Sequence, residues 1–262
     1  MLSGIDQEDF LEVRQKHLEV VSQHPLINAV LSGIQHGFVY ADPSRDSFFV
    51  CTKSGFSLFS GPDTARFNQE LLEFLLQNKD IPEYIHLYHP NSSFQNYLEA
   101  NWPKYKVRRR AQFHNHHKEL TYYYKDLLPA GFQIAVAQDV SFEQLEAAFG
   151  LNFGSRYWNS KEDFLANAVG ACILNQDGAP AAICYSACVV DGIAEMDTLV
   201  LPEYRGQRFM RIVSEPFFNQ TINHNLIPHW DTFIENSASY IMAQKFTLTL
   251  MQEYDLLSLF LR

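Results

Sequence analysis

The stretch Leu201-Pro202-Glu203-Tyr204-Arg205-Gly206-Gln207-Arg208-Phe209-Met210 decides how the C-terminal half of this chain folds. It lies between a predicted strand, residues 193–200, and a predicted helix whose apolar residues recur at helical spacing. The first turn of such a helix has unpaired backbone N–H groups and the positive end of the helix dipole. This arrangement suits a pyrophosphate, although every strand–turn–helix has one such end, and an ordinary exposed loop is the alternative.

The elements around this stretch predict an α/β (α+β) domain over residues 130–262. Strands are expected at 132–137, 169–175, 181–190, 193–200, 227–234 and 249–261, and helices are expected to begin after Ser141, Ser160, Gly206 and Asn236. Asp-Gly turns at 177–178 and 191–192 predict antiparallel hairpins. The strand at 227–234 follows a helix and can be parallel to 193–200, which can open a gap where a ligand binds. Pro216 should kink its helix or end it early.

The first 126 residues predict a second α/β domain. A helix is expected at 6–23, and an antiparallel meander at 36–41, 47–52 and 56–59. A helix capped by Asp63 or Thr64, a strand at 84–88, a helix from Asn91 or Ser92 and further strands over 104–124, with a hairpin near Asn115, complete it. Both halves thus share the order meander, helix, strand, helix, strand. Residues 127–131 form the expected boundary, because Pro129 and Gly131 interrupt regular elements.

Composition excludes several classes of protein. The net charge of −10 argues against a general nucleic-acid binder, which needs a basic footprint. The basic run at 104–110 is a local exception, either a solvated strand edge or an anion-binding patch. No apolar run is long enough to span a bilayer, and the acidic start of the chain does not fit a signal peptide. A cytoplasmic protein that does not bind membranes is the default expectation.

No metal site is expected. The four cysteines have no zinc-ligand spacing. His114, His116 and His117 form a small cluster, but no carboxylate lies at helical ligand spacing from them. His229 and Trp230 are interpreted as structural partners.

Two motifs connect the chain with a known family. Residues 202–207, Pro-Glu-Tyr-Arg-Gly-Gln, resemble the coenzyme A signature of the GCN5-related N-acetyltransferase (GNAT) superfamily, Arg/Gln-x-x-Gly-x-Gly/Ala. Residues 236–246, Asn-Ser-Ala-Ser-Tyr-Ile-Met-Ala-Gln-Lys-Phe, resemble the second GNAT motif, Asn-x-x-Ser/Ala-x-x-Leu-x-x-Lys-x-Gly-Phe. Residues 24–30, 158–164 and 228–231 resemble a bacterial two-part GNAT acetyltransferase group. The resemblance implies a mixed, mostly antiparallel sheet flanked by helices, in domains at 1–126 and 130–262, the first open to being a degenerate GNAT copy.

The resemblance also implies transfer of an acetyl group from acetyl-CoA to a small amine or a protein amino group. The residues expected at this co-substrate are Leu199, Val200, Arg205, Gly206, Gln207, Arg208, Phe209, Met210, Asn236 and Ser239. A general base must deprotonate the amine before it attacks. Glu195 and Asp197 lie on one face of their strand and are the first two candidates for the base. The alternative is that this face is simply exposed to solvent. Asp231 is the third candidate, and its alternative role is that of a capping carboxylate.

A general acid would protonate the coenzyme A thiolate. Tyr240 and Tyr254 are the available phenols, and core packing is the alternative for each. Many relatives carry a tyrosine for this purpose where this chain has Ala243.

Other departures from the family motifs leave alternatives open. Arg208 and Met210 stand where the family has small residues, and Thr247 replaces a later glycine. Arg208 could block the pyrophosphate, or its guanidinium could pair with a phosphate. A catalytically degenerate scaffold that serves as a binding or interaction protein is therefore one alternative. An aminoacyl or peptidyl transferase with two tandem GNAT-like halves is another. The acceptor and the oligomeric state, with a homodimer as one option, stay open.

Overall fold

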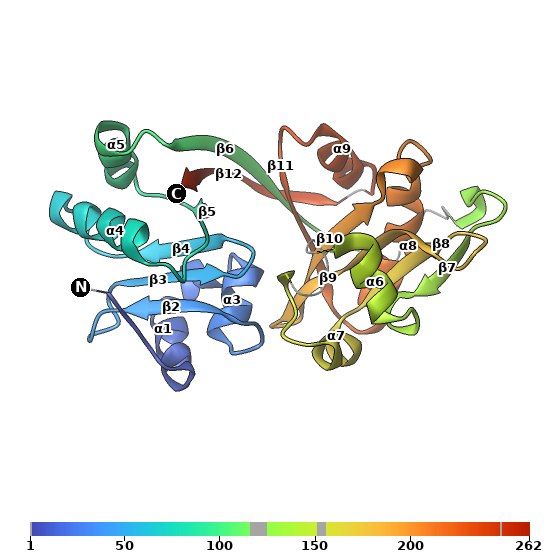
Figure 1. The fold of residues 1–262 in the computed structure, drawn as a ribbon, viewed down its shortest axis with the longest axis horizontal. Coiled ribbons are helices and arrows are strands. Elements are labelled where there is room, and N and C mark those ends of the chain that lie inside the picture. The colour runs from blue at the N-terminus through green and yellow to red at the C-terminus, as the bar shows by residue number, and fades with distance from the viewer. Residues whose placement is uncertain (1, 116–124, 151–155, 247) are drawn as a thin grey trace. The chain divides into compact units, whose positions relative to one another are not determined.

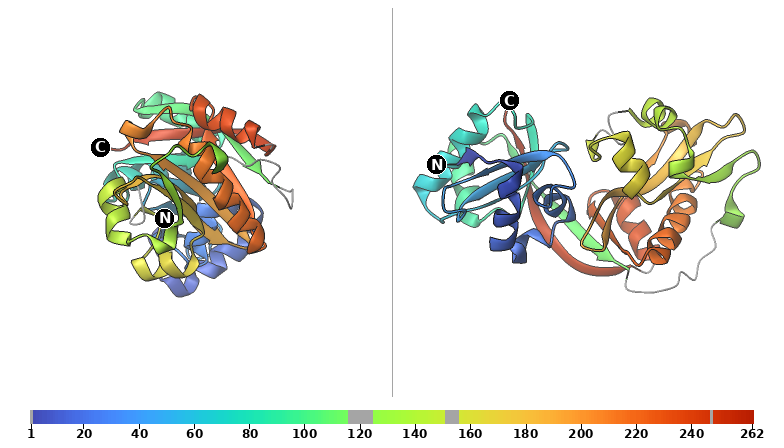
Figure 2. Two further views of the ribbon diagram at one scale, coloured as in Figure 1. Left: turned by 90° about the vertical axis from the view of Figure 1, so that its right-hand side faces the viewer. Right: turned by 90° about the horizontal axis from the view of Figure 1, so that it is seen from below.

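The computed structural model describes residues 2–115, 125–150, 156–246 and 248–262, which form two compact units. Unit 1 consists of Met1–Arg110 and Glu253–Arg262, and unit 2 of Ala111–Gln252. The chain passes from one unit to the other within two strands, β6 (Tyr105–His114) and β12 (Thr249–Phe260), which can be followed in Figure 2. This division by contacts differs from a boundary at 127–131, and the domain limits 1–126 and 130–262 stay a prediction.

Unit 1 contains the predicted meander, followed by helix, strand and helix (Figure 1). Its helices are α1 (Phe10–Lys16), α2 (Leu18–Val21), α3 (Pro25–Leu31), α4 (Ala65–Gln77) and α5 (Ser92–Asn101). Its other strands are β1 (Ser3–Gly4), β2 (Gly37–Ala41), β3 (Phe48–Thr52), β4 (Phe56–Ser60) and β5 (Tyr84–Tyr88). The strand order is β1-β2-β3-β4-β5-β12-β6, with β5 parallel to β4 and antiparallel to β12. Thr64 and Asn91 cap α4 and α5, which confirms both predicted helix starts.

The single helix predicted at 6–23 is wrong. A short 3₁₀ helix, α1 and α2 occupy this range, and the helix breaks at His17, whose φ is −118° and ψ is 25°. The imidazole Nε2 of His17 lies 2.8 Å from the carbonyl oxygen of Arg45, so a tertiary contact accompanies the break. The next helix, α3, was not predicted, and all seven of its residues are buried.

Unit 2 is a mixed sheet with helices on both faces (Figure 1). Its helices are α6 (Phe142–Phe149), α7 (Lys161–Asn167), α8 (Phe209–Asn223) and α9 (Ser237–Lys245). Its other strands are β7 (Gln133–Val136), β8 (Gly170–Leu174), β9 (Pro180–Val190), β10 (Ile193–Val200) and β11 (Ile227–Phe233). Side chains of α8 and α9 pack on one face, and those of α6 and α7 on the other. The hairpin predicted near Asn115 continues into residues that lie outside the described ranges.

The strands of unit 2 have the order β6-β11-β10-β9-β8-β7 and include the predicted mixed pairing. β7 to β10 are antiparallel neighbours, whereas β11 is parallel to β10. The parallel register covers only three pairs and ends at Glu195 opposite His229. At the same level β9 has an extra residue, Ala187, which makes a β-bulge. The ladder between β10 and β11 therefore stops midway along β10.

Helix α8 crosses Pro216 without ending. It continues through Asn223, so the predicted early end is wrong. Proline removes one N–H donor and costs a helix about 3 kcal/mol. Ile212, Val213, Phe217 and Phe218 are fully buried against the sheet, and burying side chains of this size stabilises by about 1.5–3 kcal/mol each. The packing therefore outweighs the proline. Within the described ranges, no helix has the length and apolar character needed to cross a membrane.

Candidate active site

The loop between β10 and α8 has two residues in the left-handed backbone region. Gly206 has a φ of 81°, and Arg208, the N-cap residue of α8, has a φ of 65°. A Cβ atom built on Gly206 would meet no heavy atom within 4 Å apart from its own chain neighbours. The side chain of Arg208 is exposed and that of Met210 is half-buried, so neither fills the space beside Gly206. Arg208 thus keeps a backbone conformation typical of glycine.

The same loop has free hydrogen-bond donors. Among the described residues, no hydrogen bond uses the N–H groups of residues 206–210 as donors. In the same part of the chain, Arg205 and Arg208 have no ion-pair partner. Helix α8 has 15 residues, and its dipole adds positive potential at this end. Free amides beside two unpaired guanidinium groups make an anion-binding loop.

Aromatic contacts hold the loop in place. Tyr204 stacks on Phe209 with ring centroids 6.1 Å apart, and Phe132 meets Phe209 edge to face at 4.9 Å. The Tyr204 hydroxyl accepts a hydrogen bond of 3.1 Å from the Asn175 side chain. Phe209 is 1% exposed. Of the predicted co-substrate residues, Phe209 can therefore offer only its backbone, whereas Gln207 is exposed.

The end of β10 presents a free strand edge beside this loop. Leu201 N donates to Ala181 O of β9 at 3.0 Å, and N–H directions alternate along a strand. The N–H groups of Thr198 and Val200 therefore point away from β9, toward the side where the pairing with β11 has ended. Asp197 Oδ1 accepts from Thr198 N at 3.0 Å, which leaves the N–H of Val200. Leu199 and Val200 are both half-buried, with side chains on opposite faces of the sheet.

Glu195 is buried and bonded to a histidine. Its carboxylate Oε2 contacts Nδ1 of His229, its partner on the parallel strand. Glu195 is 6% and His229 2% exposed. The ring of His114 from β6 meets the His229 ring edge to face, with centroids 4.8 Å apart, and His114 is half-buried. His116 and His117, the other members of the predicted cluster, lie outside the described residues.

Asp197 is held by a buried tyrosine. Tyr185, its neighbour on β9, donates a hydrogen bond of 3.1 Å from its hydroxyl to Asp197 Oδ2. Burial raises the pKa of Asp197 above its usual range, and the charge of Arg156 and the two hydrogen bonds oppose the shift in part. Burial also holds the pKa of Tyr185 well above 10. Asp197 and Glu195 lie on the same face of β10, opposite to Ala194 and Met196, which pack against α8.

Asp231 belongs to a chain of side-chain hydrogen bonds. Gln112 donates from Nε2 to Asp231 Oδ2 at 3.3 Å, and Gln252 donates to Gln112 Oε1 at 2.7 Å. Gln112 is 3% exposed, so β6 fixes Asp231 from within the sheet.

Helix α9 uses its predicted site residues for its own structure. The Asn236 side chain caps the helix by accepting from Ser239 N at 3.4 Å. The Ser239 hydroxyl accepts from Trp230 Nε1 at 2.9 Å, and Ala243 is fully buried. Tyr240 is half-buried and packs edge to face on Phe113 at 5.5 Å. Thr247 lies outside the described residues.

The second phenol, Tyr254, lies in unit 1. Its ring is 6% exposed and belongs to an aromatic cluster with His24, Tyr88 and His89. Tyr254 therefore packs within this aromatic cluster, and its role as an acid stays a prediction. Among the described residues, no group of three or more His, Cys, Asp or Glu side chains is placed to hold a metal ion.

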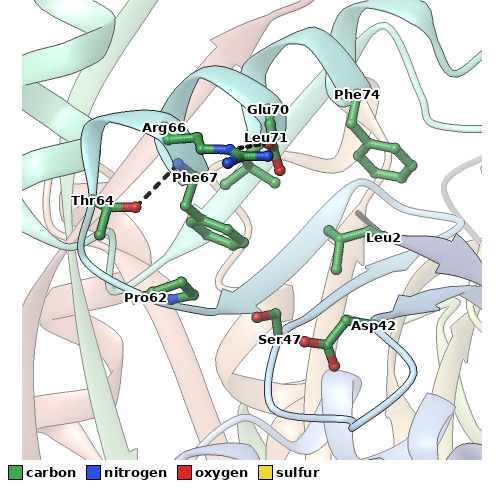
Figure 3. A pocket seen from close by; sticks show the side chains of 10 residues that line it. All are labelled: Leu2, Asp42, Ser47, Pro62, Thr64, Arg66, Phe67, Glu70, Leu71 and Phe74. Carbon is green, nitrogen blue, oxygen red and sulfur yellow. Dashed lines mark hydrogen bonds and ion pairs between the residues drawn. The ribbon is translucent and has the colours of Figure 1, made fainter.

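The corresponding loop of unit 1, between β4 and α4, has a side-chain cap and an aromatic ring over its glycine. The Thr64 hydroxyl accepts from Phe67 N at 3.2 Å, and the Phe67 ring covers Gly61 so closely that an added Cβ would lie 2.2 Å from it. Next to this loop is a pocket of about 270 Å³ with an Arg66–Glu70 ion pair of 2.8 Å on its rim (Figure 3). Phe67 and Phe74 line the pocket, and the N–H of Phe67 is used by the Thr64 cap.

Sequence reasoning missed four side chains at the site: His229 as a partner of Glu195, and Tyr185, Gln112 and His114. A signal for His229 exists. Counting forward from the start of each predicted parallel strand, residues 193 and 227, places Glu195 and His229 at the same level, as the register has them. Tyr185 could be found in the same way from the Asp191-Gly192 hairpin only if the bulge at Ala187 were known.

Known proteins resemble this chain over nearly its full length. The family described as GNAT acetyltransferase matches residues 16–257. An uncharacterized N-acetyltransferase of Bacillus subtilis, YdfB, is 26% identical over 236 residues, which are 88% of each chain. The solved GCN5-related N-acetyltransferase-like protein of Streptococcus suis has a TM-score of 0.72 at 18% identity and covers 95% of this chain and 99% of its own. A tandem GNAT protein from the clavulanic acid biosynthesis pathway has a TM-score of 0.62 at 7% identity, with 100% and 98% covered. With a family match over residues 16–257 and the mixed sheet that opens beside β10, the chain belongs to the GNAT acetyltransferase family and is an acyltransferase.

Proposed function

We propose that this acyltransferase takes its acetyl group from acetyl-CoA and transfers it to an amine. The observation that carries the proposal is the loop of residues 206–210, where free N–H groups and the unpaired guanidinium groups of Arg205 and Arg208 surround a left-handed glycine. These groups suit the diphosphate of coenzyme A. The exposed Gln207 and the backbone of Phe209 and Met210 belong to the same proposed site.

The acetyl group is proposed to lie at the free edge of β10. Acetyl-CoA supplies the thioester whose carbonyl carbon the amine attacks. The N–H of Val200 is directed toward the open side of β10 and is the proposed donor to the carbonyl oxygen, where negative charge develops. Leu199 contributes backbone and side chain to the same edge.

Glu195 is the proposed general base, with Asp197 and Asp231 as further carboxylates on the same side of the sheet. Glu195 stands at the last paired position of β10, where the strands separate. Asp197 has a raised pKa, so it holds its proton to a higher pH than an ordinary carboxyl. Tyr240 is the proposed acid for the thiolate; Asn236 and Ser239 shape the α9 side of the site through the cap and the Trp230 hydrogen bond.

Calorimetric titration with acetyl-CoA tests the proposal. We expect saturable binding that weakens when the two arginines are replaced together, in R205Q/R208Q, and remains in the matched variant R66Q/R262Q of unit 1. A chain that binds no acetyl-CoA at millimolar concentration would remove the proposal.

The second candidate function is a GNAT scaffold that binds without transferring. Arg208 and Met210 motivate it, because both replace small residues of the family signature. A thiol-release assay with a panel of primary amines and peptides separates the two. A chain that binds acetyl-CoA but releases no thiol with any acceptor favours the scaffold.

Unit 1 is proposed to shape the acceptor site or to support the fold rather than to hold a second acetyl-CoA. Its loop before α4 is covered by Phe67 and capped by Thr64. The acceptor class, an amine or a protein amino group, is part of the proposal, and nucleic acid and membranes are not among the proposed partners. All four cysteines are free and buried, which fits a reducing compartment, and we propose the cytoplasm.

A further inference from the structure

The buried cluster of Glu195, His229 and His114 links the inside of the unit 2 sheet to a half-buried imidazole. Glu195 bonds His229 Nδ1, and the His114 ring lies against the His229 ring at 4.8 Å between centroids. The outward member is His114, since His229 is 2% exposed. Three groups that can carry protons thus follow one another from the core outward.

The other ionisable groups around this cluster are held in different states. Cys188 lies opposite Glu195 on β9, and burial, reinforced by the Glu195 charge, raises the pKa of its thiol, so it stays neutral. Asp197 on β10 is bound by Tyr185, and Asp231 on β11 by Gln112 from β6. The Glu195–His229 pair, joined by the contact of Oε2 with Nδ1, is the acid–base couple that the cluster offers.

A carboxylate alone is a weak base for an ammonium ion. The ordinary pKa is about 4.3 for Glu and about 10.4 for an alkyl ammonium, so the equilibrium constant for proton transfer to the carboxylate is about 10⁻⁶. For an imidazole, whose ordinary pKa is about 6.5, the equilibrium constant for the same transfer is about 10⁻⁴. A neighbouring carboxylate stabilises the protonated ring and makes the transfer more favourable. A histidine pair backed by Glu195 is therefore the better acceptor at neutral pH.

We propose that His114 accepts the proton of the acceptor amine and passes it to the buried Glu195–His229 pair. This inference rests on the proposed function and names how its base acts. The N–H bond of R–NH₃⁺ breaks, its electron pair stays on nitrogen and attacks the thioester carbonyl, and the proton goes to a ring nitrogen of His114. His229 then takes the proton, and the Glu195 carboxylate balances the imidazolium charge. The adduct nitrogen then loses its second proton to solvent, Tyr240 protonates the departing thiolate and regains its proton from solvent, and the cluster releases the proton it took. Each turnover therefore yields the amide, the thiol and one proton.

Histidine-selective NMR titration of the full-length protein tests the pair without any substrate. The His229 signal is identified by its loss in H229Q. We expect E195Q to lower its titration midpoint by at least one pH unit, and E195D by less. H224Q, a substitution at an exposed histidine of unit 2, is the matched control and should leave the midpoint in place. An unchanged midpoint in E195Q and E195D would overturn the coupling.

The rate profile of thiol release from acetyl-CoA, with the amine that the wild type uses best, tests the relay. We expect kcat to fall at least tenfold in H114Q and H229Q with the rise between about pH 6 and 8 flattened, while KM for acetyl-CoA changes less than twofold. H224Q should match the wild type. A wild-type profile in H114Q and H229Q would overturn the relay alone, whereas a wild type that binds no acetyl-CoA overturns the proposed function.

Discussion

Replacing Arg208 by glycine should make the protein more stable and its ligand binding weaker. Arg208 has a φ of 65°, and a left-handed conformation costs a residue with a side chain about 1–2 kcal/mol. Glycine loses more backbone entropy on folding, which costs about 0.4–1 kcal/mol. The difference leaves R208G more stable by about 0.5–1 kcal/mol. For a chain of this length that corresponds to a rise in Tm of about 1–4 °C.

The same change removes a guanidinium that has no partner in the described chain. A hydrogen bond to a charged group contributes about 1.5–3 kcal/mol, and the exposed position favours the low end, so acetyl-CoA should bind about tenfold more weakly. Thermal unfolding and calorimetric titration measure both effects. N225G relieves a φ of 56° just after the other end of α8 and serves as the control, with a smaller gain in Tm and unchanged affinity. A lower Tm, or an unchanged or tighter affinity in R208G, would refute the reasoning.

Three further variants test the packing and charge of unit 2. D197N should lose less stability than the wild type as the pH rises from about 4. The pKa of Asp197 is higher in the folded than in the unfolded state, so wild-type stability is greatest below the unfolded-state pKa and falls as the pH rises toward the folded-state pKa. Urea unfolding at several pH values measures this, and parallel curves of stability against pH would contradict it. S239A should cost about 1–3 kcal/mol because it leaves the buried Trp230 N–H without its acceptor, while S237A at an exposed position should cost less than about 0.5; equal urea midpoints would count against it. Q220A should cost about 1–3 kcal/mol, since the Gln220 amide makes two 2.9 Å bonds to the backbone of Gly170, and Q244A is its exposed control; a loss below about 0.5 would show that water replaces both bonds.

Local chemistry made most of the unit 2 strands predictable. Asp191 and Gly192 have φ values of 49° and 75°, which an Asp-Gly turn adopts readily, and they fix the hairpin of β9 and β10. Side chains that hydrogen-bond to backbone N–H groups at Ser141, Ser160 and Asn236 marked the starts of α6, α7 and α9 correctly. These signals act over a few residues, so the sequence contains them whole.

The errors come from contacts between distant residues. Helix α3 has no polar face because all its residues are buried, so periodicity could not reveal it, although Pro25 at its first position was a usable start signal. The break at His17 involves Arg45, 28 residues away. The Glu195–His229 bond joins residues 34 apart, and it depends on a register that helix α8 sets between two strands. The co-substrate residues, Glu195, Asp197 and Tyr240 stay predictions for the reaction itself.

The passage of β12 from unit 2 into unit 1 constrains how the polypeptide can acquire its structure. Leu256 to Phe260 pair with Tyr84 to Tyr88, and Leu257, Leu259 and Leu261 are buried in the unit 1 core. These leucines are synthesised after all of unit 2, so the hydrophobic interior of unit 1 cannot close until β12 has left the ribosome. Neither unit can therefore be expressed alone by cutting the chain at a single point, and deletion of residues 256–261 should destabilise unit 1.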